Sequence, residues 1–161
     1  MFTGKPEQFF LEQDDGLVEF ARSLVRIRSY SDHEGELARH IAEKMRELSF
    51  DEVFMDSTGN VVGRIGNGPR KILFDSHMDT VEVNDEQDWD LPPFSGEIKD
   101  GRLYGRGSVD MKSGLAASVF AAVAARELGY LSGKAVYVTT TVCEEYCDGE
   151  NLKMLFREHP I

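Results

Sequence analysis

The alternation of segments between residues 70 and 142 restricts the fold more than any other feature of this chain. A short apolar run, Ile72-Leu73-Phe74, precedes a long loop, and an alanine-rich segment at residues 111–128 then ends at Gly129. A β-branched run follows at residues 135–142. The first and last runs suit buried strands, and the middle segment suits a helix stopped by a glycine. The order predicts a strand–helix–strand crossover, which places two parallel strands in one sheet and is almost always right-handed.

Other patterns complete a single α/β domain. Apolar residues at helical spacing predict a first helix, and a capping-box sequence, Ser31-Asp32-His33-Glu34, precedes a second. Short apolar runs bounded by turn residues predict strands, and Asp100-Gly101 predicts a hairpin turn. The expected elements are helices at 15–29 and from about 35 to 49, strands at 53–55, 61–65 and 72–74, and a hairpin at 97–104.

Composition excludes several classes of partner. The 161 residues include 18 Lys plus Arg and 29 Asp plus Glu, which gives a net charge of -11. Nucleic acids and anionic membranes need a basic face, so we expect neither as a partner. The N-terminus lacks the apolar core of a signal peptide and no stretch approaches the length of a membrane span, so we expect a cytoplasmic protein.

The chain has two cysteines, Cys143 and Cys147. In a cytoplasmic setting we expect both to be reduced. A zinc site built on this pair alone would lack the four protein ligands that structural zinc sites usually have.

A histidine and a carboxylate follow the first crossover strand. His77 and Asp79 are two residues apart, so in extended backbone their side chains lie on one face. A neutral imidazole is a good zinc ligand, and a neighbouring carboxylate can accept its other ring proton. Taken alone, the short pair is better explained as a surface histidine beside a surface aspartate.

A second acidic position precedes the crossover helix. Asp110 follows Gly105-Arg106-Gly107, which allows a sharp backbone turn. An aspartate at this position could also be the N-cap of the helix. Lys112-Ser113 after glycines suggests a phosphate loop, but Met111 stands where that motif needs a glycine. We therefore expect Lys112 to be a structural cation or one beside the acidic cluster.

Glu144-Glu145 follows the second crossover strand. Adjacent carboxylates leaving a buried strand are costly unless a cation meets them, although such pairs are also frequent on surfaces. In extended backbone the two side chains would point in opposite directions. Because carboxyl ends of parallel strands share one edge of the sheet, His77, Asp110 and the glutamates should converge there. The joint arrangement predicts a metal site, and mutual repulsion should raise the pKa of at least one of the carboxylates.

These motifs resemble the co-catalytic zinc family that includes aminoacylase, carboxypeptidase G, acetylornithine deacetylase and succinyl-diaminopimelate desuccinylase. The resemblance covers nearly all of residues 15–161, including 89–94 and 101–107. It implies a three-layer α/β/α fold with a mostly parallel sheet, as in zinc exopeptidases. Residues 144–149 also resemble the branch of the family linked to selenium metabolism.

The resemblance implies a role for each motif residue. His77 would bind one metal ion, Asp110 would bridge both, and Glu145 would bind the other. Asp79 would orient His77, and Glu144 would be the general base. The implied cofactors are two divalent ions, zinc first and cobalt or manganese as alternatives. The implied reaction is hydrolysis of the amide bond of an N-acyl amino acid or small peptide, and the peptide bond after Asp110 is expected to be cis.

The chain departs from the family in length. Members continue with a further carboxylate ligand, a lid or dimerisation domain and a late histidine ligand, so we interpret residues 1–161 as the N-terminal part of a catalytic domain. Each metal would have only two protein ligands here, fewer than the three usual in catalytic zinc sites. We expect a truncated sheet with an open edge and an uncovered apolar face, and a longer protein that forms a homodimer. The alternative is an inactive relative that binds a metal or a partner.

Overall fold

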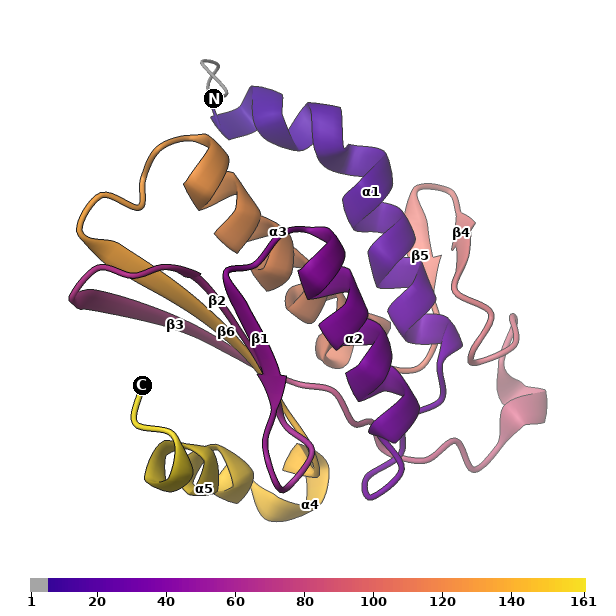
Figure 1. Ribbon diagram of the computed structural model, residues 1–161. Coiled ribbons are helices and arrows are strands. Elements are labelled where there is room, and N and C mark those ends of the chain that lie inside the picture. The colour runs from indigo at the N-terminus through magenta and orange to yellow at the C-terminus, as the bar shows by residue number, and fades with distance from the viewer. Residues whose placement is uncertain (1–5) are drawn as a thin grey trace.

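The computed structural model describes residues 6–161, except for the side chains of residues 10–14. Helices and strands alternate along the chain as the sequence predicts, although the first helix begins earlier than expected (Figure 1). The elements are α1 (Pro6–Arg26), α2 (Gly35–Glu47), β1 (Glu52–Met55), β2 (Val61–Gly66), β3 (Arg70–His77), a 3-10 turn (Glu86–Asp88), β4 (Glu97–Lys99), β5 (Arg102–Tyr104), a wide turn (Ser108–Lys112), α3 (Ser113–Glu127), β6 (Lys134–Thr141), α4 (Glu144–Cys147) and α5 (Glu150–Glu158).

The main sheet has the strand order β1-β2-β6-β3. The crossover prediction is confirmed, because β3 and β6 pair in parallel. The expectation of a mostly parallel sheet is wrong for the residues described, since β2 is antiparallel to both β1 and β6. For β1 and β2 the reason is local: the Asp56 carboxylate accepts hydrogen bonds from the N–H groups of Thr58, Gly59 and Asn60, and this turn reverses the chain between the two strands.

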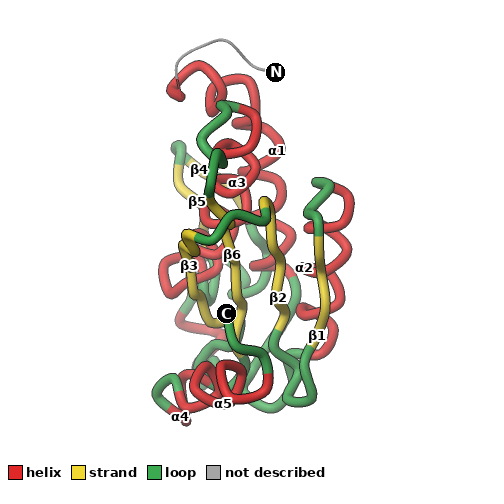
Figure 2. Tube along the Cα trace, turned by 60° about the vertical axis from the view of Figure 1, so that its left-hand side comes forward, coloured by secondary structure: helices red, strands yellow, loops and turns green. Residues whose placement is uncertain are grey.

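Helices lie on both sides of the sheet, which confirms the α/β class. α2 and α3 pack against one face, with α1 against α3, whereas α5 lies on the other side near the lower strand ends (Figures 1 and 2). Ile72 and Phe74 of the edge strand β3 are 36% and 40% exposed, although they pair with Val136 and Val138 of the core, so the core-facing side of the sheet is left uncovered at this edge. An open edge and an exposed apolar face are therefore present, as expected.

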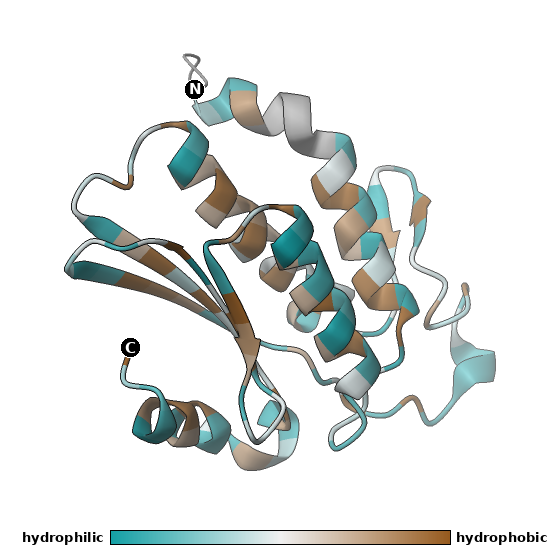
Figure 3. Cartoon of the chain, viewed as in Figure 1, coloured by the Kyte–Doolittle hydropathy of each residue, from teal (hydrophilic) through white to brown (hydrophobic). Residues whose placement is uncertain are grey.

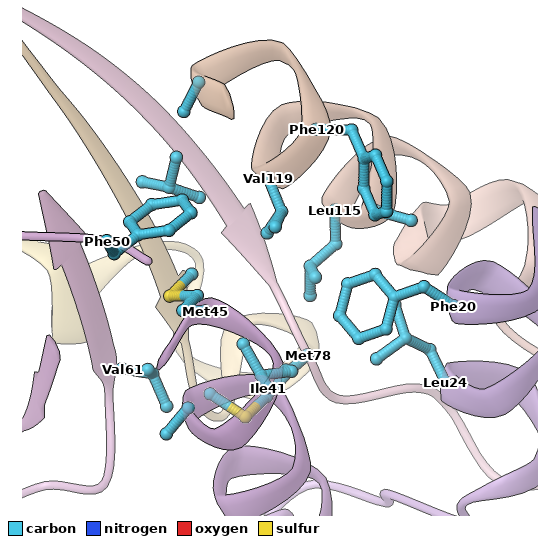
Figure 4. Close-up of a cluster of buried hydrophobic side chains, with 14 of the residues drawn as sticks. Phe20, Leu24, Ile41, Met45, Phe50, Val61, Met78, Leu115, Val119 and Phe120 are labelled. Atoms are coloured by element: carbon cyan, nitrogen blue, oxygen red, sulfur yellow. The ribbon is translucent and has the colours of Figure 1, made fainter. Parts of the chain in front are cut away.

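The core fills the space between the sheet and the three N-terminal helices. Leu115 and Val119 of α3 are fully buried and face Ile41 and Met45 of α2 (Figure 4). The body of α3 is mainly hydrophobic, whereas hydrophilic and hydrophobic residues alternate along α2 (Figure 3). This difference matches their positions, because α3 is covered by the sheet and α1 while α2 keeps one face outward.

The apolar character of α3 corrects one expectation from the sequence. Residues Ser108–Glu127 are long and apolar enough, by length and composition, to cross a membrane. In the structure this segment is broken at Asp110, and α3 packs against β6, β3 and α1. An alanine-rich helix buried between two layers can be as apolar as a membrane span, which explains why this core helix passes a test of length and composition.

Candidate metal centre

The two parallel strands bring the motifs to one edge of the sheet. His77 is the last residue of β3 and pairs with Thr141, the last residue of β6. α4, which holds Glu144 and Glu145, begins three residues after Thr141 and lies at the same end of the sheet (Figure 1). The turn at Ser108–Lys112 contacts β3, α1 and α3, so Asp110 enters the same region from the loop side.

Three side chains meet at this edge. One potential ligand atom from each of His77, Asp110 and Glu145 lies within 4.8 Å of the others. His77 Nε2 is 3.0 Å from Asp110 Oδ1 and 3.9 Å from Glu144 Oε2. The cluster opens into a cleft of about 390 Å³ that is also lined by Val81 and residues 105–109. One imidazole and two carboxylates that share a cleft suit a zinc-type ion.

Asp79 supports the cluster through hydrogen bonds of its buried carboxylate. Its side chain is fully buried, and its carboxylate accepts hydrogen bonds from Ser31 Oγ at 2.7 Å and from the backbone N–H groups of Glu144 at 3.0 Å and Glu145 at 3.1 Å. His77 Nδ1 lies 3.1 Å from the Asp79 carbonyl oxygen and 3.4 Å from its Oδ1. Asp79 therefore positions both the imidazole and the turn that bears the glutamates.

The pKa values reflect these contacts. For His77, burial lowers the pKa, but contacts with Asp79 and Asp110 and the charge of Glu144 outweigh burial and raise the pKa to about 9. For Asp79, burial raises the pKa, but the contacts with His77, Ser31 and the N–H groups of α4 lower it to about 2. The expectation that repulsion raises a carboxylate pKa is thus wrong for Asp79, because donors surround it. A pKa of about 9 favours a protonated imidazole facing the carboxylates at neutral pH.

Asp110 lies in a non-helical turn. Its φ and ψ are -121° and 101°, the Asp110–Met111 peptide bond is cis as expected, and α3 has no side-chain N-cap hydrogen bond. The alternative of Asp110 as a helix cap is therefore wrong. Gly105 permits the approach of this loop, since a Cβ there would lie 2.4 Å from Val25 Cγ1. The Asp110 side chain is 75% exposed and faces the cleft.

Lys112 is structural rather than a partner of the acidic cluster. Its side chain is fully buried, and Nζ donates to the carbonyl oxygens of Leu24 at 3.0 Å and Ile27 at 2.8 Å. Burial lowers the pKa of this amine to about 8. The contact ties the turn before α3 to the C-terminal end of α1, where exposed carbonyls favour a positive charge.

The glutamates differ from expectation in backbone conformation. Cys143 has a left-handed φ of 56°, and Glu144 and Glu145 begin the helical turn α4 instead of continuing the extended strand. Their N–H groups point together at Asp79 as the first donors of that turn. Glu144 keeps a side chain 36% exposed, while Glu145 joins His77 and Asp110.

Two supporting residues were not predicted as part of the site. Ser31 and Glu34 look like a capping box, yet α2 has no side-chain cap, and Glu34 Oε1 instead accepts a hydrogen bond from Cys143 N–H at 2.8 Å. Ser31 donates to Asp79. The spacing of Ser31 and Glu34 suggested a cap of the adjacent helix, whereas their hydrogen-bond partners, Asp79 and Cys143, are distant in sequence.

His159 and the cysteines lie outside the ligand cluster. The His159 ring lies 4.8 Å from the ring of Phe54, centre to centre, and both cysteines are free thiols. Among the residues that the structure describes, His77, Asp110 and Glu145 form the group suited to a metal ion.

Comparison with known proteins places these features in a family. Residues 73–157 match the model of peptidase family M20/M25/M40. The chain is 39% identical over 133 residues to the uncharacterized protein YgeY of Escherichia coli strain K12, and 34% identical over 137 residues to a probable succinyl-diaminopimelate desuccinylase of Staphylococcus epidermidis. Each match covers 83% of this chain and 33% of the relative, so the chain spans one third of the length of these curated relatives.

A solved structure agrees with the sequence matches. The M20 family metallo-carboxypeptidase Sso-CP2 from Sulfolobus solfataricus superposes with a TM-score of 0.76 at 25% identity, over 91% of this chain and 34% of that protein. The family match over residues 73–157 includes β6, the part of β3 from residue 73 onward and all five motif residues. The chain belongs to peptidase family M20/M25/M40.

Proposed function

We propose that this chain is the N-terminal part of the catalytic domain of a two-metal hydrolase that cleaves amide bonds in N-acyl amino acids or small peptides. The observation that carries the proposal is the convergence of His77, Asp110 and Glu145 within 4.8 Å at a cleft. Relatives named as a desuccinylase and a metallo-carboxypeptidase support an amide substrate. We propose zinc as the metal, with cobalt or manganese as alternatives.

The donor set fits two ions that share one ligand. His77 and Asp110 would hold one ion, and Asp110 and Glu145 the other, with Asp110 exposed enough to present both oxygens. Bound divalent ions would polarise the scissile carbonyl and make water more acidic. Asp79 keeps the imidazole in one orientation through Nδ1, which leaves Nε2 directed at the ligand cluster.

Glu144 is suited to proton transfer rather than metal binding. Its Oε2 lies 3.9 Å from His77 Nε2, so it faces the cluster, and its side chain remains partly exposed to solvent. Its backbone is fixed by the bond from its N–H to Asp79. Glu144 would take a proton from the attacking water and deliver it to the leaving nitrogen of the amide.

A pair of variants tests this division of roles in a protein extended to the length of its relatives. Glu144→Gln should lower kcat by about 10²-fold or more while sparing the metal content. Glu145→Gln should lower the metal content before it affects turnover by any other route. Glu150→Gln, on the exposed side of α5, is the matched control for loss of one carboxylate. Metal analysis that finds Glu144→Gln empty and Glu145→Gln loaded would reverse the assignment.

The alternative is a relative that binds metal without turnover. The ligand count favours it, since the described residues supply two protein ligands to each ion. If the extended protein binds metal in its wild-type form yet hydrolyses no N-acyl amino acid or dipeptide, the alternative is correct. A cytoplasmic location and a homodimeric longer protein stay predictions.

A further inference from the structure

The two cysteines flank the turn that carries the glutamates. Cys143 immediately precedes α4 and Cys147 is its last residue, so Glu144 and Glu145 lie between them. Their sulfur atoms are 3.2 Å apart although both thiols are free. Cys143 is 9% exposed and Cys147 is exposed to solvent. Neither thiol has a part in the proposed hydrolysis.

The distance between the sulfur atoms is short enough for a disulfide bond. An S–S bond is about 2.0 Å long, so the sulfurs need to approach by roughly 1.2 Å. Cys147 N–H donates to the Cys143 carbonyl at 3.0 Å, which is the i, i+4 bond of one helical turn. A disulfide also needs Cβ atoms about 3.5–4.5 Å apart. The sulfur atoms can therefore bond once the turn tightens by roughly 1 Å.

The tightening falls on the C-terminal half of the turn. Cys143 is buried, and its N–H is bound to Glu34 Oε1. Glu144 N–H is bound to the fully buried Asp79. Cys147 is exposed and precedes Asp148, which has a left-handed φ of 48°. Glu145 N–H is bound to Asp79 as well, at 3.1 Å, so closure displaces residues 146–147 and strains this last supporting bond of Glu145.

We propose that Cys143 and Cys147 form a reversible disulfide site whose oxidation weakens metal binding by Glu145. The oxidant is a small-molecule disulfide. The exposed Cys147 sulfur attacks it, forms a mixed disulfide and releases one thiol; the Cys143 sulfur then attacks the mixed disulfide and releases the second. The protein pair loses two hydrogen atoms and two electrons, and the small disulfide becomes two thiols.

The effect on the metal follows from the size of the movement. Metal–ligand distances are tolerant to about 0.2 Å, and closure needs a shift of roughly 1 Å across the turn. A displacement of Glu145 relative to His77 and Asp110 should cost about 10-fold in affinity or more, the effect of losing a supporting contact. This consequence rests on the proposed metal site; the sulfur chemistry does not.

The sulfur chemistry is tested on the 161-residue chain with oxidised glutathione. We expect intact-mass spectrometry to show a monomer lighter by two hydrogen atoms, with no thiol left to alkylate and full reversal by dithiothreitol. Cys147→Ser should show no such loss. A stable glutathione adduct on Cys147, a disulfide-linked dimer or unreacted thiols would overturn the proposal.

The metal effect is tested by titrating Co²⁺ into reduced chain, oxidised chain and the Cys147→Ser chain treated with and without oxidant. The oxidised wild type should bind about 10-fold more weakly than the reduced form, and the variant should bind like the reduced form in both conditions. Equal affinity of oxidised and reduced wild type, or weak binding by the reduced variant, would refute control by the disulfide. Failure of the reduced wild type to bind Co²⁺ would refute the metal site and leave the mass result intact.

Discussion

Metal binding should displace a proton from His77, and the number displaced follows from its surroundings. Contacts with Asp79 and Asp110 overcome burial and raise the pKa of His77 to about 9. At pH 7 such an imidazole is about 99% protonated, whereas one with the ordinary value of about 6.5 is only about 24% protonated. Because a metal accepts the neutral imidazole, binding one ion should release about one proton instead of about a quarter.

Two measurements check this number. Calorimetric titration of Zn²⁺ in buffers with different ionisation enthalpies gives the protons released per ion, and NMR titration of the metal-free chain gives the pKa of His77 directly. Asp79→Asn should lower both, since it removes the carboxylate beside Nδ1. Asp90→Asn, an exposed aspartate outside the cluster, should change neither.

The same pKa has a consequence for stability. Because the folded pKa of His77 lies above its ordinary value of 6.5, the protonated ring stabilises the metal-free fold fully below about pH 6.5. This contribution is lost as the pH rises toward about 9. An NMR midpoint near 6.5 together with release of about a quarter of a proton would refute the reasoning, because the imidazole would then not be paired with the carboxylates.

Three further outcomes are expected. The 161-residue chain alone should show little hydrolysis of N-acyl amino acids, and rapid turnover that survives removal of contaminating enzymes would contradict its incomplete ligand set. Leu115→Ala in the fully buried core should lower the free energy of unfolding by about 2–5 kcal/mol in urea titrations; a loss below about 1 kcal/mol would show that the core is not packed as described. Burial raises the pKa of Glu34 above 4.5, so its contribution to the free energy of unfolding should fall as the pH rises through that higher value. Glu34→Gln keeps an acceptor for Cys143 N–H and should flatten this fall in urea titrations at a series of pH values. An unchanged slope would argue against a raised pKa of Glu34.

The parts of the fold that the sequence predicted are those set by short-range patterns. The run at residues 135–142, the alanine-rich helix and its terminal Gly129 all depend on neighbouring residues, and each appears in the structure. The crossover then fixes which strand ends meet, so the grouping of His77 and the glutamates followed from topology alone. The antiparallel pairing of β2 with β6 depends on contacts between residues 69 to 79 positions apart, and no local pattern marks it.

The support around the metal ligands could not be predicted for the same reason. The donors to the Asp79 carboxylate come from Ser31, 48 residues earlier, and from Glu144 and Glu145, 65 and 66 residues later. Ser31 also fits the pattern of a helix cap, so its neighbours in the sequence offered no reason to look for a distant partner such as Asp79. A buried carboxylate cannot stay charged without donors, so the burial of Asp79 requires that such donors exist. Which residues supply them is decided only when the chain folds, because three loops must meet before any of the bonds can form.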